Sequence, residues 1–108
     1  MSNSVTEEIL RFDLLDMADV ALAIGTSQRT VLRWSTEGIP PRRKSADRLL
    51  ELRAVLDLAV QTLPKGSVLN WLRGPVPALD YGKPLELIRD GDFRRVIAAL
   101  QHKTAETQ

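Results

Sequence analysis

Apolar residues recur at three- and four-residue steps along most of this 108-residue chain, and no stretch alternates between apolar and polar residues over the length of a strand. Steps of three and four place side chains on one face of a helix, whereas a half-buried strand alternates. The sequence therefore predicts an all-α fold. We expect an N-terminal helix-turn-helix bundle, a long central helix and a small helical region at the C terminus.

The segment 17–36, MADVALAIGTSQRTVLRWST, has the pattern of a helix-turn-helix. Val20 and Ile24 share one face of a first short helix, and Val31 and Trp34 return to the same core from a second helix. A glycine falls between the two helices, where the chain must turn sharply. This order of residue types is hard to meet by accident, and it indicates a binding motif rather than a catalytic one.

Residues with a preference for helix ends bound these two helices. Asp16 can accept backbone N–H groups at the start of the first helix, and Gly25 supplies the left-handed conformation that ends it. Thr26 or Ser27 then caps the second helix. Thr26 departs slightly from the usual pattern, because an aliphatic residue is more common directly after the turn glycine.

Two further helices flank the motif. Thr6 and the apolar spacing that continues to Leu15 predict a first packing helix, preceded by a frayed end over residues 1–6. A long helix is predicted from Ser45 to Leu63, and it is either central to the core or shared with a second molecule. Its recurring apolar positions are Leu49, Leu52, Leu56, Ala59, Val60 and Leu63.

Pro64-Lys65-Gly66 breaks this helical pattern, so we place a domain boundary there, between residues 1–63 and 64–108. The second domain should contain a short helix from Ser67, a second one that begins at Pro84 and a last one capped by Asp92. We expect a loop over residues 78–83 and a mobile tail over residues 102–108.

Charge is distributed unevenly, although the whole chain has a net charge of only +1. Residues 1–25 carry a net charge of −4, residues 26–48 a net charge of +4, and the remainder +1. A basic segment that begins at the second helix of a helix-turn-helix suits a surface that faces phosphates. A solvated charged face that binds nothing is the plainer interpretation.

Composition removes several classes of function. The chain has no cysteine and a single histidine, His102, so disulfides and multi-histidine metal sites are excluded and the usual catalytic residue sets are missing. We therefore predict a protein that is not an enzyme and that has no metal site and no cofactor. No apolar run has the length of a membrane span, and Glu7 and Glu8 stand where a secretory signal would be basic, so we expect a cytoplasmic protein.

Side chains at the start of the second helix of a helix-turn-helix contact base edges in the major groove. Arginine can pair with guanine, glutamine with adenine, and serine or threonine with bases or phosphates. The candidate DNA-contacting residues in the motif are Ser27, Gln28, Arg29, Thr30 and Arg33. Arg42, Arg43 and Lys44 follow as candidate phosphate contacts, which orient a protein on DNA without reading its sequence. Three-helix units of this spacing also occur as plain packing scaffolds.

A second block has the sequence NWLRGPVPALDYGKPLELIRDGDFRRVIAAL. Like the helix-turn-helix, it resembles a known family. Together, from about residue 6 to residue 101, the two blocks resemble the Xre/MbcA/ParS-like antitoxins of bacterial toxin–antitoxin pairs. The second block is the more specific one. Its matching positions are Trp71, Pro75, Leu79, Gly82, Pro84, Leu87, Ile88, Gly91, Arg95 and Val96.

The resemblance implies an antitoxin with an Xre-like N-terminal domain, whose ParS/MbcA-like C-terminal domain binds and blocks a cognate toxin. In such pairs the toxin is usually a RES-domain enzyme that consumes NAD⁺, so the NAD would belong to the partner. The resemblance further implies that the antitoxin binds the promoter of its own operon, as a homodimer or in a hetero-oligomer with the toxin. The candidate toxin-contacting residues are Trp71, Arg73, Tyr81, Lys83, Arg89, Asp92, Arg94, Arg95, His102 and Lys103.

Two other functions compete with this interpretation. In a stand-alone helix-turn-helix transcriptional regulator, the C-terminal helices would only dimerise or sense a ligand. A small enzyme is the weakest alternative, because the chain offers no nucleophile–base pair and no set of metal ligands.

Overall fold

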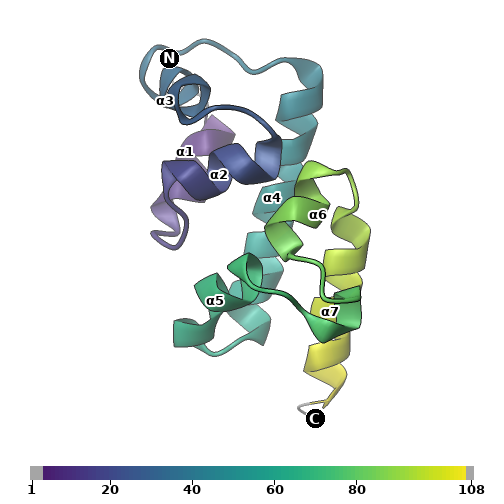
Figure 1. Ribbon diagram of the computed structural model, residues 1–108. Coiled ribbons are helices and arrows are strands. Elements are labelled where there is room, and N and C mark those ends of the chain that lie inside the picture. The colour runs from purple at the N-terminus through teal and green to yellow at the C-terminus, as the bar shows by residue number, and fades with distance from the viewer. Residues whose placement is uncertain (1–3, 107–108) are drawn as a thin grey trace.

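The computed structural model describes residues 4–106, and over this range it confirms the predicted all-α fold (Figure 1). The regular elements are α1 (Ser4–Arg11), α2 (Met17–Ile24), α3 (Gln28–Thr36), α4 (Arg43–Thr62), the 3₁₀ helix η1 (Lys65–Ser67), α5 (Val68–Arg73), the 3₁₀ helix η2 (Pro77–Leu79), α6 (Pro84–Arg89) and α7 (Phe93–Glu106). The one β feature in this range is an isolated antiparallel bridge between Val76 and Gly82.

Capping residues define α2 and α3 much as their types predict. The Asp16 side chain accepts the backbone N–H of Asp19, the Asp19 side chain accepts that of Asp16, and the pair forms a capping box. Gly25 ends α2 in the left-handed conformation, with φ of 82°. Ser27, rather than Thr26, caps α3, because its hydroxyl accepts the N–H of Thr30 at 3.2 Å.

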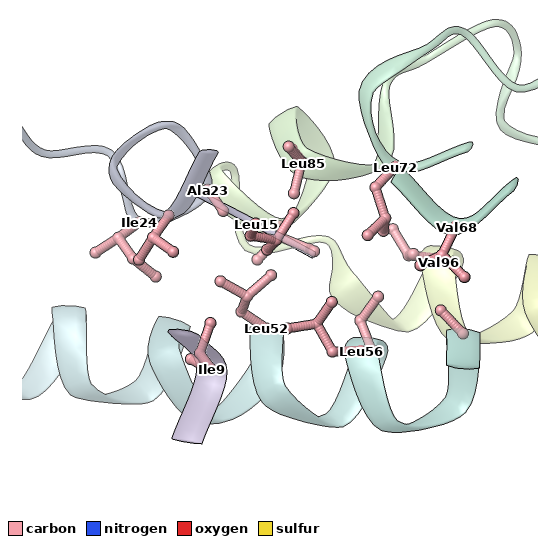
Figure 2. Packing of buried hydrophobic residues seen from close by; sticks show 14 of the residues in the cluster. Ile9, Leu15, Ala23, Ile24, Leu52, Leu56, Val68, Leu72, Leu85 and Val96 are labelled. Atoms are coloured by element: carbon pink, nitrogen blue, oxygen red, sulfur yellow. The ribbon is translucent and has the colours of Figure 1, made fainter. Parts of the chain in front are cut away.

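Helix α4 lies at the centre of the molecule and packs against α1 and α2 as well as α6 and α7. Its residues Leu52 and Leu56 are fully buried and belong to one continuous core with Ile9 of α1, Leu85 of α6 and Val96 of α7 (Figure 2). The predicted central role of this helix is therefore confirmed. Leu63 is buried as predicted, whereas Val60, predicted to lie in the core, is 43% exposed and borders an open hollow beside Phe12 and Val68.

The two ends of the described chain differ from the predictions. Helix α1 already includes Ser4 and Val5, so the frayed end is wrong for those positions, and residues 1–3 lie outside the described range. The helix also ends at Arg11 rather than Leu15, although Leu15 is still buried from the following loop. At the other end the predicted mobile tail is wrong for 102–106, because α7 continues through Glu106. Residues 107–108 lie outside the described range.

Short elements connect the C-terminal half. Helix α5 begins at Val68, after a 3₁₀ turn that takes up the predicted break. The predicted loop over 78–83 contains η2 and the Val76–Gly82 bridge instead of irregular chain alone. Helix α6 begins at Pro84 as predicted, and it packs along α2. The helices before and after residue 63 thus share one hydrophobic core.

None of the helices within residues 4–106 combines the length and the apolar character that are needed to cross a membrane.

Candidate nucleic-acid and protein interfaces

The outward face of α3 is polar, and the opposite face anchors the helix in the core. Val31 and Trp34 are buried, with 0% and 5% exposure. Gln28 and Arg29, two of the predicted DNA-contacting residues, are exposed in the first turn of the helix. The inward apolar pair therefore fixes which side of α3 meets solvent, and it leaves the side chains suited to base contacts on the outside.

Leu32 lies on the same outward face and was missed by the sequence prediction. It is 43% exposed, and it lies one helical turn after Arg29 and directly before Arg33 in the chain. Apolar side chains at such positions contact the methyl group of thymine. The sequence does contain a signal for Leu32, because it is an apolar residue between two arginines on the face of the helix opposite Val31 and Trp34.

The predicted phosphate contacts Arg42, Arg43 and Lys44 are exposed at the start of α4, the helix that follows α3. Among the described residues none of these three cations, nor Arg29, forms an ion pair. Arg33 differs, since its Nε lies 3.3 Å from Oε2 of Glu37 one turn later. The basic surface that the charge distribution predicts is thus present and largely without intramolecular counter-charges.

A long-range ion pair ties the start of α2 to the end of α5. Arg73 donates from Nε to Oδ1 of Asp19 at 2.9 Å and from Nη2 to Oδ2 of Asp19 at 2.7 Å. The same Nη2 lies 3.6 Å from Oδ2 of Asp16. Because this fork engages the capping box itself, Arg73, predicted as a toxin contact, also holds the two halves of the chain together.

The ionisation of Asp19 reflects this arrangement. Burial of the carboxyl works to raise the pKa of Asp19, but the hydrogen bond from Arg73, the backbone N–H of Asp16 and the positive charge of Arg73 together lower it below its ordinary value. The hydrogen bond to Asp19 likewise raises the pKa of Arg73. Both groups are therefore charged at neutral pH, and the pair is an ion pair rather than a neutral hydrogen bond.

The turn between η2 and α6 presents an aromatic ring to solvent. Tyr81 is 70% exposed, and both it and Asp80 adopt left-handed backbone conformations, with φ of 63° and 54°. The turn is closed by hydrogen bonds from the N–H of Tyr81 to the carbonyl of Val76 and from the N–H of Val76 to the carbonyl of Gly82. Two consecutive non-glycine residues at positive φ are costly, and such strain clusters at binding sites.

Gly82 is required by the packing of this turn. A Cβ at this position would lie 2.7 Å from Cδ1 of Leu87 and 3.0 Å from the carbonyl oxygen of Leu79. The turn therefore sits tightly on α6, which fixes the position from which Tyr81 projects.

A shallow hollow of about 260 Å³ lies between η2 and α7. Arg95 and His102 border it, and small side chains of α7 line its floor. The carboxylates of Asp92 and Asp80 lie 3.2 Å and 3.5 Å from the Arg95 guanidinium. The structure thus brings together Asp92, Arg95 and His102, three of the predicted toxin contacts, at or beside this hollow, and Tyr81 directly follows Asp80 in the chain.

The chain is similar to curated antitoxins along almost its whole length. It is 32% identical over 100 residues to the mycobacterial cidal antitoxin MbcA of Mycobacterium tuberculosis, covering 93% of this chain and 88% of that protein, and equally similar to the MbcA of Mycobacterium bovis. A probable mycobacterial cidal antitoxin of M. tuberculosis, Rv3188, is 34% identical over 83 residues, covering 77% of this chain and 70% of that protein. This chain belongs to the MbcA family of antitoxins. No family model matches it.

The fold of this MbcA-family chain also matches a solved structure. A chain in the crystal structure of the M. tuberculosis MbcT–MbcA toxin–antitoxin complex superposes with a TM-score of 0.83 at 28% identity, covering 97% of this chain and 95% of that chain. The similarity therefore includes both the N-terminal helices and the C-terminal block.

The remaining predicted toxin contacts lie elsewhere on this MbcA-family fold. Arg89 ends α6 beside the turn after α2, where a Cβ on Gly25 would lie 3.3 Å from its Cγ, and its Nε contacts Asp90 at 3.0 Å. Trp71 is half-buried against the core, and its Nε1 is buried without a hydrogen-bond partner in the described chain. Lys83, Arg94 and Lys103 are exposed. The ten predicted residues thus do not form one patch.

No cluster of three or more acidic or histidine side chains that could hold a metal ion occurs among the described residues.

Proposed function

We propose that this protein is an antitoxin that binds a cognate RES-domain toxin, occludes its NAD-consuming active site and also binds the DNA of its own operon. The observation that carries the proposal is the similarity to MbcA, at 32% identity over 93% of this chain. The MbcT–MbcA complex, whose chain shares this fold, is itself a toxin–antitoxin complex. The NAD chemistry belongs to the partner, and we expect this chain to act in a hetero-oligomer with it.

Within residues 64–108, the Tyr81 turn is our choice for the centre of the toxin contact. Tyrosine is enriched among the residues that dominate binding energies, and an anchor that is already fixed in place loses little entropy on binding. The close packing of Gly82 against α6 and the hydrogen bonds that close the turn hold Tyr81 in place. The hollow bordered by Arg95 and His102 lies against η2, which precedes this turn, and gives a toxin side chain a place to enter.

Co-expression with the product of the neighbouring RES-type gene tests this function. The toxin alone should arrest growth and deplete cellular NAD, and this chain should restore both and co-purify with the toxin. Replacing Tyr81 by Ala should weaken the complex at least tenfold, because truncating a central aromatic anchor costs about 2 kcal/mol. Tyr81→Phe, which keeps the ring, is the matched variant and should lose much less.

A neighbour that is harmless alone, or one that remains toxic and unbound in the presence of this chain, would contradict the antitoxin function. Equal affinities for wild type and Tyr81→Ala would leave the function standing and remove Tyr81 from the contact.

DNA binding by α3 is supported by the exposed residues Gln28, Arg29 and Leu32 and by the unpaired cations at the start of α4. Arg29→Ala should lower affinity for the operator by about tenfold and for unrelated DNA by less, because a bidentate contact to guanine contributes about 1–3 kcal/mol of discrimination. Toxin neutralisation should be unchanged in this variant. Loss of both activities in a folded protein would contradict the division of labour.

The unpaired cations also favour a second candidate function, a stand-alone transcriptional regulator. Such a protein would bind its operator without any partner and with a steep dependence on salt. If the purified chain binds operator DNA but no toxin, this alternative replaces the antitoxin.

A further inference from the structure

A hollow of about 410 Å³ lies between α3, the segment that follows it and the first turn of α4. Its walls combine apolar side chains, hydroxyl groups and two arginines. The lining residues are Thr26, Thr30, Arg33, Trp34, Ile39, Pro40, Arg42 and Ser45. The residues come from α3 and α4, from the loop between them and from the turn before α3, so the α3–α4 hollow exists only in the folded chain.

The polar groups in this α3–α4 hollow suit an oxyanion. Arg33 and Arg42 provide guanidinium groups, which match the geometry of phosphate oxygens, and Thr26, Thr30 and Ser45 provide hydroxyl donors. Arg42 has no carboxylate partner among the described residues. Arg33 has one, since Glu37 accepts from its Nε at 3.3 Å, and both side chains of that pair are more than half exposed. No carboxylate of the described residues lines the hollow itself.

The start of α4 adds unused donors on the same side. Arg42 is the N-cap and makes no side-chain capping hydrogen bond, and the first helical hydrogen bond runs from the N–H of Ala46 to the carbonyl of Arg42. The N–H groups of the preceding positions, including that of Ser45, therefore have no acceptor within the helix. The positive end of the dipole of this 20-residue helix favours an anion there.

We propose that the α3–α4 hollow holds a backbone phosphate of bound DNA, with Arg33 and Arg42 as its charged ligands and Glu37 as a competitor that the phosphate must displace from Arg33. This inference rests on the proposed DNA binding and gives Arg33 a different task from the base contact predicted from its position in the motif. Base reading is then left to Gln28, Arg29 and Leu32. Glu37 limits affinity, because its ion pair with Arg33 is lost when the phosphate binds.

Fluorescence anisotropy with the full-length chain tests the hollow on two labelled duplexes of equal length, the operator and an unrelated sequence, across a salt series. Arg42→Ala should weaken binding to both duplexes by a similar factor, about tenfold at low salt, and should reduce the salt slope by about one. Glu37→Gln should strengthen binding to both by about threefold, because it frees Arg33.

Two variants with the same charge changes serve as controls. Lys65→Ala removes a cation beyond the far end of α4, and Asp57→Asn removes an exposed carboxylate nearly four turns along that helix, so neither should change binding. Circular dichroism melts establish that all four variants are folded.

The possible outcomes distinguish a failure of the phosphate site from a failure of the proposed DNA binding. If wild type binds DNA while Arg42→Ala and Glu37→Gln bind like wild type, the phosphate site is wrong and DNA binding stands. If Arg42→Ala weakens binding to the operator alone, Arg42 reads bases, and the phosphate site is again wrong. If wild type binds neither duplex, alone or with its toxin, the DNA function fails and the phosphate site fails with it.

Discussion

Two groups of cations in this molecule differ in whether they have carboxylate partners. On α3 and at the start of α4, Arg29, Arg42 and Lys44 lack ion-pair partners among the described residues. On α5 and α7, Arg73 and Arg95 each contact two carboxylates. Exposed cations without partners repel one another, and a polyanion removes that repulsion when it binds. Paired arginines instead fix the local geometry of the fold.

The comparison separates the tasks that we propose for two surfaces that share one core. The N-terminal surface contains exposed cations without carboxylate partners among the described residues. The C-terminal surface has a defined shape, which comes from the strained Tyr81 turn and from the hollow between η2 and α7. Charge suits a uniform partner such as the DNA backbone, whereas shape suits one particular protein. Because Arg73 reaches across to Asp19, the C-terminal block also supports the helix that precedes α3.

The largest expected effect tests whether the two surfaces depend on one core. Leu56 of α4 is fully buried between the halves, so Leu56→Ala should lower the free energy of unfolding by about 3 kcal/mol. In each single-tryptophan variant, urea unfolding followed by the fluorescence of the remaining tryptophan and by far-UV circular dichroism should give one midpoint. Trp34 lies in one half and Trp71 in the other, whereas circular dichroism reports on both halves. Each tryptophan variant is measured with and without Leu56→Ala.

The matched control is Leu50→Ala on the same helix. Leu50 is 53% exposed, and its truncation should change the unfolding free energy by less than about 0.5 kcal/mol. Two separate midpoints, with only one moved by Leu56→Ala, would show that the halves unfold independently and would break the comparison as drawn.

A smaller effect is expected from the ion pair between the halves. Asp19→Asn keeps an oxygen that can accept the N–H of Asp16 in the capping box but removes the charge that faces Arg73. It should lower the free energy of unfolding by about 2 kcal/mol. Asp47→Asn, at an exposed carboxylate of α4 without an ion pair among the described residues, should have little effect. Equal stability of wild type and Asp19→Asn at neutral pH would contradict the role assigned to the pair.

The same pair predicts a dependence on pH. Burial opposes ionisation of Asp19, but the hydrogen bond and charge of Arg73 prevail and lower its pKa below the value of 3.8 expected in the unfolded chain. The stabilisation is therefore complete above that value and is lost as pH falls through the lower pKa of the folded state. The difference in stability between wild type and Asp19→Asn should shrink below about pH 4. A difference that stays constant down to pH 2 would contradict this linkage.

Local features were predictable from the sequence because local chemistry determines them. The capping role of Asp16, the left-handed Gly25 and the inward placement of Val31 and Trp34 depend on neighbours within one or two turns. The apolar spacing of α4 likewise predicted its central position. Val60 was misplaced because its spacing fits the apolar stripe, although it borders an open hollow with Phe12 and Val68 instead of being covered.

Features that depend on tertiary contacts could not be predicted in this way. Asp19 and Arg73 are 54 positions apart, and nothing in the sequence near either residue indicates the other. Tyr81 was a candidate contact by residue type, but its left-handed backbone follows from the hydrogen bonds that close the turn. The α3–α4 hollow likewise needs the first turn of α4 to fold back toward α3, which no single segment encodes.

The smallest expected effect on stability comes from Gly82→Ala, which tests whether the fixed geometry of the Tyr81 turn matters for binding. In Gly82→Ala the new methyl group would meet Leu87 at 2.7 Å and the Leu79 carbonyl at 3.0 Å. The turn or α6 must shift, and we expect the free energy of unfolding to fall by about 1 kcal/mol. Because Tyr81 adjoins this glycine, toxin affinity should fall further than the loss of stability alone requires, whereas DNA affinity should not change.

Gly66→Ala is the matched control for this substitution, because a Cβ there meets nothing within 4 Å. It should leave toxin affinity unchanged and stability within about 0.5 kcal/mol of wild type. Thermal melts and toxin-binding isotherms of both variants decide the point. If Gly82→Ala binds the toxin as tightly as Gly66→Ala does, then the fixed geometry of the Tyr81 turn has no part in recognition. The C-terminal surface would then act, like the N-terminal one, through its charges.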